Sequence, residues 1–177
     1  MELFDCLNEK HRDFIAKQHL FFVGTAAAQG RVNVSPKGMD SLRIIDDNTL
    51  RWLNLTGSGN ETAAHVADNE RMTLMLCSFD KQPLILRIYG LATIIAKGDQ
   101  KWNDLVVDFP DYRGARQIFE LNVDLVQTSC GYAIPHYQHL GERDTLIKWT
   151  DKKTDDELQE YRQQKNSISL DGKPIDI

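Results

Sequence analysis

The sequence predicts a mainly β protein, an antiparallel sheet that closes as a barrel with flanking helices. About seven short runs are rich in the β-branched and aromatic residues typical of strands, and turn residues alone separate most of them. Helix-like segments stand at the start, after the fourth strand and between the last two strands. Hairpin connections favour antiparallel pairing, and closing a sheet as a barrel removes its exposed edges.

The first third of the chain predicts one amphipathic helix followed by four strands, at residues 2–18, 20–27, 32–38, 42–45 and 49–55. The helix is indicated by apolar residues at three- and four-residue steps, Leu3, Phe4, Leu7, Phe14 and Ile15 among them. Pro36 lies near the end of the second strand. Because proline has no amide hydrogen, we expect that strand at an edge or a bulge.

The middle of the chain predicts a short helix, two strands, a second helix and a last strand, at residues 63–67, 71–77, 85–95, 98–109 and 118–127. Gly90 inside a strand indicates a bulge or a tight bend. In the last strand one face is predicted to be buried, with Phe119, Leu121, Val123 and Leu125 on it and Glu120, Asn122, Asp124 and Val126 on the other.

Residues 1–143 are expected to form the barrel domain. Residues 144–165 predict a polar helix, which with the tail to residue 177 either packs on the same domain or extends from it.

Composition excludes several classes of protein. The net charge of −5, with basic residues spread through 177 positions, does not match a nucleic-acid binder. No apolar run approaches the roughly 20 residues needed to cross a membrane, and no signal segment opens the chain. Cys6, Cys77 and Cys130 are far apart and odd in number, which favours a reducing, cytoplasmic setting without disulfides.

A glycine-rich stretch at residues 57–62 joins a predicted strand to a predicted helix. Gly57 and Gly59 let the backbone approach a ligand, and the first amides of a helix are unpaired and favour an anion such as phosphate. The same residues also fit an ordinary helix cap, because Ser58 and Glu61 have the spacing of a capping box. The stretch alone leaves both interpretations open.

Ser35 and Lys37 lie on the same side of their predicted strand. A hydroxyl beside an ammonium is a reasonable clamp for a phosphate monoester. A serine and a lysine at a strand end also occur on surfaces without any function.

The order of these segments resembles the pyridoxamine 5′-phosphate oxidase-like flavoproteins, whose split β-barrel binds FMN at a homodimer interface. The resemblance is carried by residues 33–38, 52–62 and 87–90, and residues 126–135 are similar to one uncharacterised branch. It implies that Lys37 and Ser35 meet the FMN phosphate beside the glycine-rich stretch, and that the backbone of residues 52–55 runs along the flavin ring. The cofactor-binding residues so implied are Ser35, Lys37, Trp52, Leu53, Asn54, Leu55, Gly57, Ser58, Gly59, Asn60, Thr62 and Arg87.

The sequence departs from the biosynthetic oxidase in two places. The Arg-Lys pair on that enzyme's phosphate loop is replaced here by residues 60–62, so the phosphate is expected to rely on amides, Ser58, Asn60, Thr62 and Lys37. Residues 130–177 lack the arginine and histidine arrangement that holds the vitamin substrate, so pyridoxamine-phosphate oxidation is not expected. Arg87 is open to two interpretations, a cofactor contact or a salt bridge.

The expected function is that of a homodimeric FMN oxidoreductase. It passes electrons between NADH, NADPH or another reductant and an unknown small substrate. The alternatives are a flavin- or ligand-binding module without turnover, or the same fold with a deazaflavin or haem. No catalytic residue is identified. No metal site is expected, because His136 and His139 have a helical spacing but no third ligand. Cys130 is either inert packing or a redox-active thiol.

Overall fold

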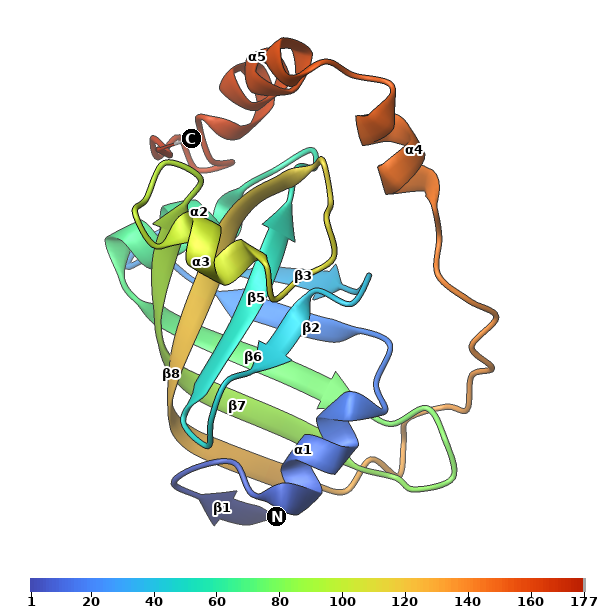
Figure 1. Cartoon of the computed structure of the whole chain (residues 1–177). Coiled ribbons are helices and arrows are strands. Elements are labelled where there is room, and N and C mark those ends of the chain that lie inside the picture. The colour runs from blue at the N-terminus through green and yellow to red at the C-terminus, as the bar shows by residue number, and fades with distance from the viewer. Residues whose placement is uncertain (177) are drawn as a thin grey trace.

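Residues 1–176, which the computed structural model describes, form one strongly curved antiparallel sheet with five helices around it (Figure 1). The strands are β1 (Glu2–Phe4), β2 (Phe21–Thr25), β3 (Asn33–Lys37), β4 (Leu42–Ile44), β5 (Thr49–Leu55), β6 (Arg71–Cys77), β7 (Ile85–Ala96) and β8 (Ala115–Ser129). The helices are α1 (Glu9–Ala16), α2 (Glu61–Asp68), α3 (Trp102–Val106), α4 (Thr145–Asp151) and α5 (Asp155–Asn166). The predicted fold class, an antiparallel barrel with flanking helices, is confirmed.

The strand order is β3-β2-β6-β7-β8-β5-β4, with β1 paired to the C-terminal end of β8. The long strands β7 and β8 form the middle of the sheet, and β3 and β4 form its edges. The prediction that Pro36 lies on an edge strand is confirmed, because β3 pairs only with β2. Ser35 and Lys37 therefore lie on the rim of the sheet.

Two apolar clusters cover the two faces of the sheet. The larger is centred on Trp52 and Phe119, whose stacked rings have centroids 4.6 Å apart. The smaller contains Leu53, Ile118 and Trp102. Burying one side chain of this size contributes about 1.5–3 kcal/mol. Where β5 and β8 pair they are covered on both faces, which makes them a firm base for the loop that follows β5.

The predicted alternation along β8 holds as far as Val123 and then reverses. Val126 is fully buried and Leu125 is half-buried, the opposite of the prediction. The cause is a register shift beside Gly90, which leaves Asp124 as an extra residue in β8. The predicted irregularity at Gly90 is thus confirmed, but the prediction for β8 did not include its effect.

The helix predicted over residues 2–18 is wrong at its start. Residues 2–4 instead form β1, which pairs with Val126, Gln127 and Thr128 of β8. The helix begins after Asn8 because a capping box forms there. The Asn8 side chain accepts the His11 amide at 3.0 Å, and the His11 ring accepts the Asn8 amide at 3.2 Å.

Two other helices differ from prediction in length. The helix expected over residues 144–165 is divided into α4 and α5, because Thr154 and Glu157 form a capping box that begins a new helix. The helix expected over residues 98–109 is only α3, since the Asp99 carboxylate accepts the Ala96 amide at 2.6 Å and forms a turn there. No helix within residues 1–176 is long and apolar enough to span a bilayer.

The connection from β8 to α4, residues 130–144, contains no helix or strand. It runs along one side of the sheet, and α5 then leads the chain back to the end of the sheet where α2 lies (Figure 1). Ile175 is buried there as part of the larger apolar cluster. The tail therefore contributes to the core.

Gly90→Ala should destabilise the fold. A Cβ at this position would overlap the backbone carbonyl of Asn122 in β8 and lie 3.1 Å from Leu121 Cδ1. Forcing the two long central strands apart is expected to cost about 1–3 kcal/mol of unfolding free energy, measured by chemical denaturation. Gly98→Ala is the control, because a Cβ there meets no atom within 4 Å. Equal stability of the two variants would contradict this account.

Candidate functional site

A cavity of about 280 Å³ opens where β3, the end of β5, the start of α2 and the start of β8 meet. Nine residues of the sequence prediction line it: Ser35, Lys37, Asn54, Leu55, Gly57, Ser58, Gly59, Asn60 and Thr62. Asn33, Glu61 and Arg116 complete the lining. The fold thus brings the glycine-rich stretch and the Ser35–Lys37 pair to one place.

The glycine-rich stretch does not use the cap that its spacing allows. The N-cap of α2 is Asn60, and its side chain makes no capping hydrogen bond. The Glu61 carboxylate instead accepts the Leu170 amide at 3.0 and 3.1 Å. Within residues 1–176, the amides of residues 58–62 donate to no other group. They are therefore available to an anion at the helix start.

Three buried polar atoms around the cavity have no hydrogen-bond partner among the described residues. They are Ser35 Oγ, Asn60 Nδ2 and Arg116 Nε. Asn54 fixes the orientation of Asn60, because Asn54 Nδ2 donates to Asn60 Oδ1 at 3.1 Å. An unpaired buried polar group costs about 1–3 kcal/mol. Since all three atoms can donate, their gathering indicates a ligand rich in acceptor oxygens.

Two cations, the buried Arg116 and the half-buried Lys37, add a positive potential. Arg116 is 5% exposed and donates to neutral oxygens, the Asn166 side chain at 2.6 Å and the Gly59 carbonyl at 3.3 Å. Burial, and then the nearby Arg162 charge, lower the pKa of Arg116 to about 9. Burial, and then the Arg116 charge, lower the pKa of Lys37 to about 8. Both groups stay charged at neutral pH.

These cations have no acidic partner. The ion pairs found within residues 1–176 include none of Lys37, Arg116 and Arg162. The Lys37 ammonium instead lies 5.2 Å from the centroid of the Trp52 ring. A bound anion would offset the desolvation of both cations and satisfy the unpaired donors around them.

The C-terminal helix holds the glycine-rich stretch from outside. Asn166 is fully buried at the end of α5, and its amide group donates to the Gly57 carbonyl at 3.0 Å while its oxygen accepts from Arg116. Arg162, one helical turn earlier, donates to Thr56 Oγ1 at 2.9 Å. One helix thus positions both the loop and the buried arginine.

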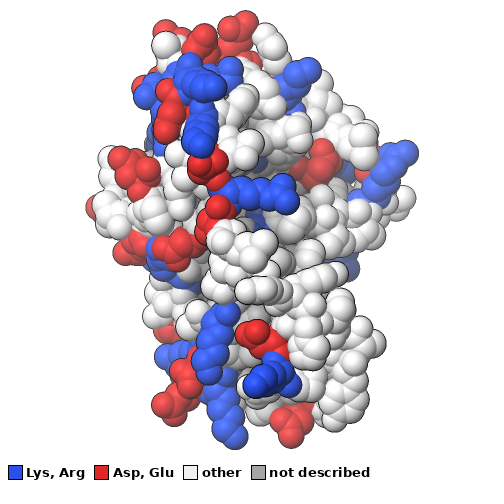
Figure 2. Space-filling view, turned by 90° about the vertical axis from the view of Figure 1, so that its right-hand side faces the viewer, with Lys and Arg blue, Asp and Glu red and all other residues white. Residues whose placement is uncertain are grey.

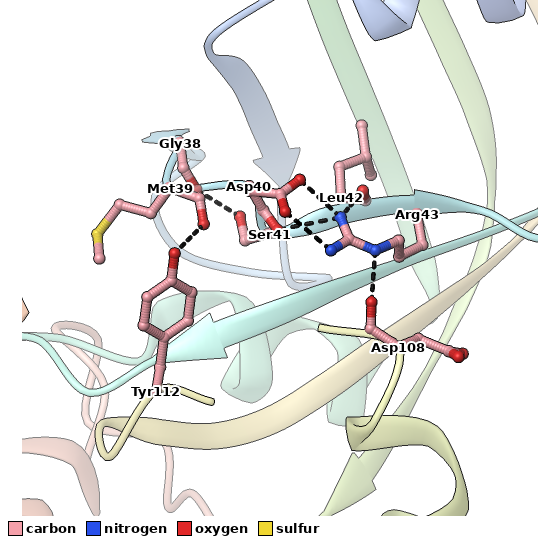
Figure 3. A network of polar contacts seen from close by, with 8 residues as sticks. All are labelled: Gly38, Met39, Asp40, Ser41, Leu42, Arg43, Asp108 and Tyr112. Carbon is pink, nitrogen blue, oxygen red and sulfur yellow. Dashed lines mark hydrogen bonds and ion pairs between the residues drawn. The ribbon is translucent and has the colours of Figure 1, made fainter. Parts of the chain in front are cut away.

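The loop after Lys37 is held by a second network (Figure 3). Met39 and Asp40 adopt positive φ values of 60° and 51°. The Tyr112 hydroxyl donates to the Met39 carbonyl at 2.7 Å. The Arg43 guanidinium donates to both Asp40 carboxylate oxygens, at 2.8 and 3.0 Å, and to the Asp108 carbonyl at 2.6 Å. These contacts fix the chain immediately after β3.

Three residues of the sequence prediction do not line the cavity. The Trp52 and Leu53 side chains belong to the two apolar clusters, so only their backbone is left for a cofactor contact. Arg87 lies on β7 and donates to Ser129 Oγ at 3.1 Å. Any cofactor contact from these three residues remains a prediction.

Sequence reasoning missed Arg116, Asn33 and Asn166. Arg116 lies just before the strand predicted at residues 118–127, and extending that strand by two residues would have included it. Asn33 donates to Thr62 Oγ1 at 3.3 Å and so links β3 to α2. No sequence pattern linked Asn166 to the site, since this residue ends a polar helix far along the chain.

The fold is a β-barrel with a cationic, donor-rich cavity at a helix start, and the chemistry of this cavity suits a phosphate-like anion. Comparison with known proteins identifies the family. The family model described as pyridoxamine 5′-phosphate oxidase matches residues 7–130. The pyridoxamine 5′-phosphate oxidase family protein ustO of Aspergillus flavus is 34% identical over 189 residues, covering 97% of this chain and 76% of ustO. The chain belongs to the pyridoxamine 5′-phosphate oxidase family.

Solved structures agree on the fold. A Lactobacillus delbrueckii protein described as a pyridoxamine 5′-phosphate oxidase superposes with a TM-score of 0.59 at 18% identity, over 70% of this chain and 95% of that one. HupZ of Group A Streptococcus superposes with a TM-score of 0.55 at 20% identity, over 75% of this chain and 99% of that one. At such identities the likeness concerns the fold alone.

The affinity of the cavity for sulfate should fall as pH rises through about 8. Sulfate keeps its charge over this range, so the change reports the protein. Because Lys37 has a pKa of about 8 in the free chain, its charge is complete below that value and lost above it. A bound anion favours the charged form, so binding near pH 9 should take up a proton. Calorimetry between pH 6.5 and 9.5 measures both quantities.

Lys37→Ala is the control for this titration. It should bind sulfate weakly at pH 6.5 and show little further loss up to pH 8.5, since the remaining cation, Arg116, keeps its charge there. A wild-type affinity that is constant from pH 6.5 to 9.5 would contradict the assignment of Lys37 to the anion site.

Proposed function

We propose that this chain binds FMN, with the 5′-phosphate in the cavity lined by Lys37, Arg116 and residues 57–62. The observation that carries the proposal is the set of unpaired donors and uncompensated cations around one small cavity. A phosphate monoester is dianionic and has several acceptor oxygens, so it matches this set in charge and in hydrogen bonding. The family of the chain supports FMN as the phosphate carrier.

The residues present fit a phosphate better than the sequence indicated. The phosphate loop lacks an Arg-Lys pair, but Arg116 supplies a second cation from β8. Ser35 Oγ, Asn60 Nδ2 and Arg116 Nε would donate to phosphate oxygens, and the amides at the start of α2 would add the helix dipole. Leu55 lies at the cavity wall, where β5 ends, so the backbone of β5 would be within reach of the remainder of a cofactor anchored there.

We further propose that the protein is an oxidoreductase. Bound FMN supplies hydride or electron transfer. The chain's own residues anchor the phosphate, and the backbone of residues 52–55 is proposed to meet the ring, as the resemblance implies. A nicotinamide donor, NADH or NADPH, and a small substrate complete this proposal. The alternatives are a flavin-binding module without turnover and the same site holding a deazaflavin or haem.

A homodimer is proposed as the working form. A groove of about 450 Å³ along β2, β6 and β7 exposes Val32 and Leu91, which are 72% and 47% accessible. We propose a second copy as the cover of this groove, as the resemblance to a family of homodimers implies. Sedimentation or gel filtration at micromolar concentration tests the dimer, and a monomer would count against it.

A reducing, cytoplasmic setting is also proposed. The three cysteines are unpaired, which supports it.

FMN binding should depend on the phosphate cations, and riboflavin binding should not. Lys37→Ala and Arg116→Met should each weaken FMN binding by about 10- to 150-fold, the equivalent of one lost charged hydrogen bond of about 1.5–3 kcal/mol. Asn166→Asp should also weaken it, because a carboxylate beside Arg116 competes with the phosphate. Quenching of flavin fluorescence measures each affinity.

Riboflavin is FMN without the phosphate. Comparing the two ligands therefore separates the contribution of the phosphate from that of the rest of the molecule. The riboflavin affinity should be nearly the same in the wild type and the variants. Lys97→Ala removes an exposed lysine outside the cavity and should leave FMN affinity unchanged. Loss of riboflavin and FMN affinity in equal proportion would place the flavin elsewhere, and a wild type that binds no FMN would end the proposal.

The FMN-loaded protein should oxidise NADH or NADPH with reduction of the flavin band under anaerobic conditions. The rate should fall in Lys37→Ala in proportion to the flavin lost and recover at saturating FMN, because Lys37 holds the phosphate and not the reacting ring. If chemical reductants bleach the flavin and neither nicotinamide does, the nicotinamide donor is excluded and the binding module is favoured.

A further inference from the structure

Three side chains that commonly bind metal ions meet outside the phosphate cavity. They are His19, just before β2, and His139 and Glu142, in the connection from β8 to α4. One possible ligand atom from each lies within 4.8 Å of the other two. The sequence had suggested His136 as the partner of His139, but the structure gives His139 a different one, since His136 contacts the Phe79 carbonyl at 3.3 Å.

The backbone brings these side chains to one point. Gly141, between His139 and Glu142, has a φ of 126°, a conformation that favours glycine. Gly38 provides the surface beneath them, because a Cβ there would lie 3.3 Å from the His19 carbonyl oxygen and 3.6 Å from Glu142 Oε2. Both segments therefore pack on the residue that follows Lys37.

We propose that His19, His139 and Glu142 bind one divalent transition-metal ion, with Zn²⁺ as the reference. Two imidazole nitrogens and one carboxylate oxygen are a ligand set that Zn²⁺ and its neighbours in the first transition row accept. Ca²⁺ and Mg²⁺ prefer oxygen ligands alone, so they are excluded by the two histidines. Three protein ligands leave an open position on a tetrahedral ion.

The same three residues line a larger pocket, of about 720 Å³, that also includes Lys37, Arg143 and Trp149. An open metal position here would face two basic side chains, which favours an anionic fourth ligand such as a small carboxylate. Lys37 lines both this pocket and the phosphate cavity. The metal site and the anion site are therefore neighbours, but the metal proposal does not depend on flavin binding.

Metal binding requires a small rearrangement of the two histidines. Their rings are stacked, with centroids 3.6 Å apart and planes 9° apart. The nitrogen lone pairs lie in the ring planes, so parallel rings cannot both point at one ion between them. Metal–nitrogen bonds of about 2.0–2.1 Å also require the ligand atoms to lie closer together than 4.8 Å, the distance within which they now lie. Both residues are exposed, and the χ2 torsion of histidine has a broad energy minimum, so a tilt out of the stack costs little.

The cluster does not lie on a surface crowded with acidic residues, which would bring a carboxylate near histidines without any metal site. Figure 2 shows the side of the molecule along which the connection runs, and uncharged residues predominate over its middle and right. Glu142 is the one acid of the cluster, beside two histidines. It lies 3.9 Å from His139 Nε2, close enough to share an ion with it after a small movement.

Titration of the full chain without an affinity tag tests the proposal. Zn²⁺ should bind at one ion per chain in calorimetry without added FMN, and Co²⁺ should give the visible absorption of a nitrogen- and oxygen-ligated ion. His19→Ala and His139→Ala should each weaken Zn²⁺ binding by about tenfold or more, since even residues that only support a metal ligand are worth 10- to 100-fold. Glu142→Gln should weaken it in the same direction.

His136→Ala is the matched control, because it removes a nearby histidine of the same connection that is outside the cluster. It should leave the affinity and the Co²⁺ spectrum unchanged. Circular dichroism confirms that each variant is folded. Absence of saturable binding, or binding that survives in the His19→Ala, His139→Ala double variant, would overturn the proposal whether or not the protein binds FMN.

Discussion

Positive charge buried without a negative partner is the constraint on which the site depends. Removing a guanidinium and an ammonium from water is costly, and a carboxylate at the position of Asn166 would be the ordinary way to offset it. This chain uses a neutral amide there, which satisfies the hydrogen-bonding geometry of Arg116 and leaves its charge uncancelled. The remaining positive potential is available to a ligand, at the expense of stability in the free protein.

The sheet supplies the rigidity that this arrangement needs. Four segments far apart in the chain contribute to the cavity or support it: β3, the loop after β5, the start of β8 and the end of α5. β5 and β8 are packed on both faces, so the loop and Arg116 start from fixed strands. β3 is an edge strand with few neighbours, and the network from Arg43 to Tyr112 holds the chain that follows it.

Local patterns predicted the strands, the edge position of Pro36 and the irregularity at Gly90, because each depends on a residue and its immediate neighbours. Two of the errors involve distant partners, whereas the division of the helix predicted at residues 144–165 and the shortness of α3 come from a local cap and a local turn. β1 forms because residues 2–4 find the free end of β8, and Val126 turns inward because Gly90 of another strand displaces the register. The same limit applied to the site. The cavity's loop was visible as a motif, whereas Arg116 and Asn166 join it only through tertiary packing.

The contacts of α5 also determine when, during synthesis of the chain, the site can form. Asn166 and Arg162 are synthesised more than a hundred residues after the loop that they hold, as the sequence separations of 109 and 106 show. A chain still on the ribosome can pair β3 with β2 and form α2, but its glycine-rich loop and Arg116 lack their partners. The cavity is therefore completed last, after the whole barrel and its closing helix have been made.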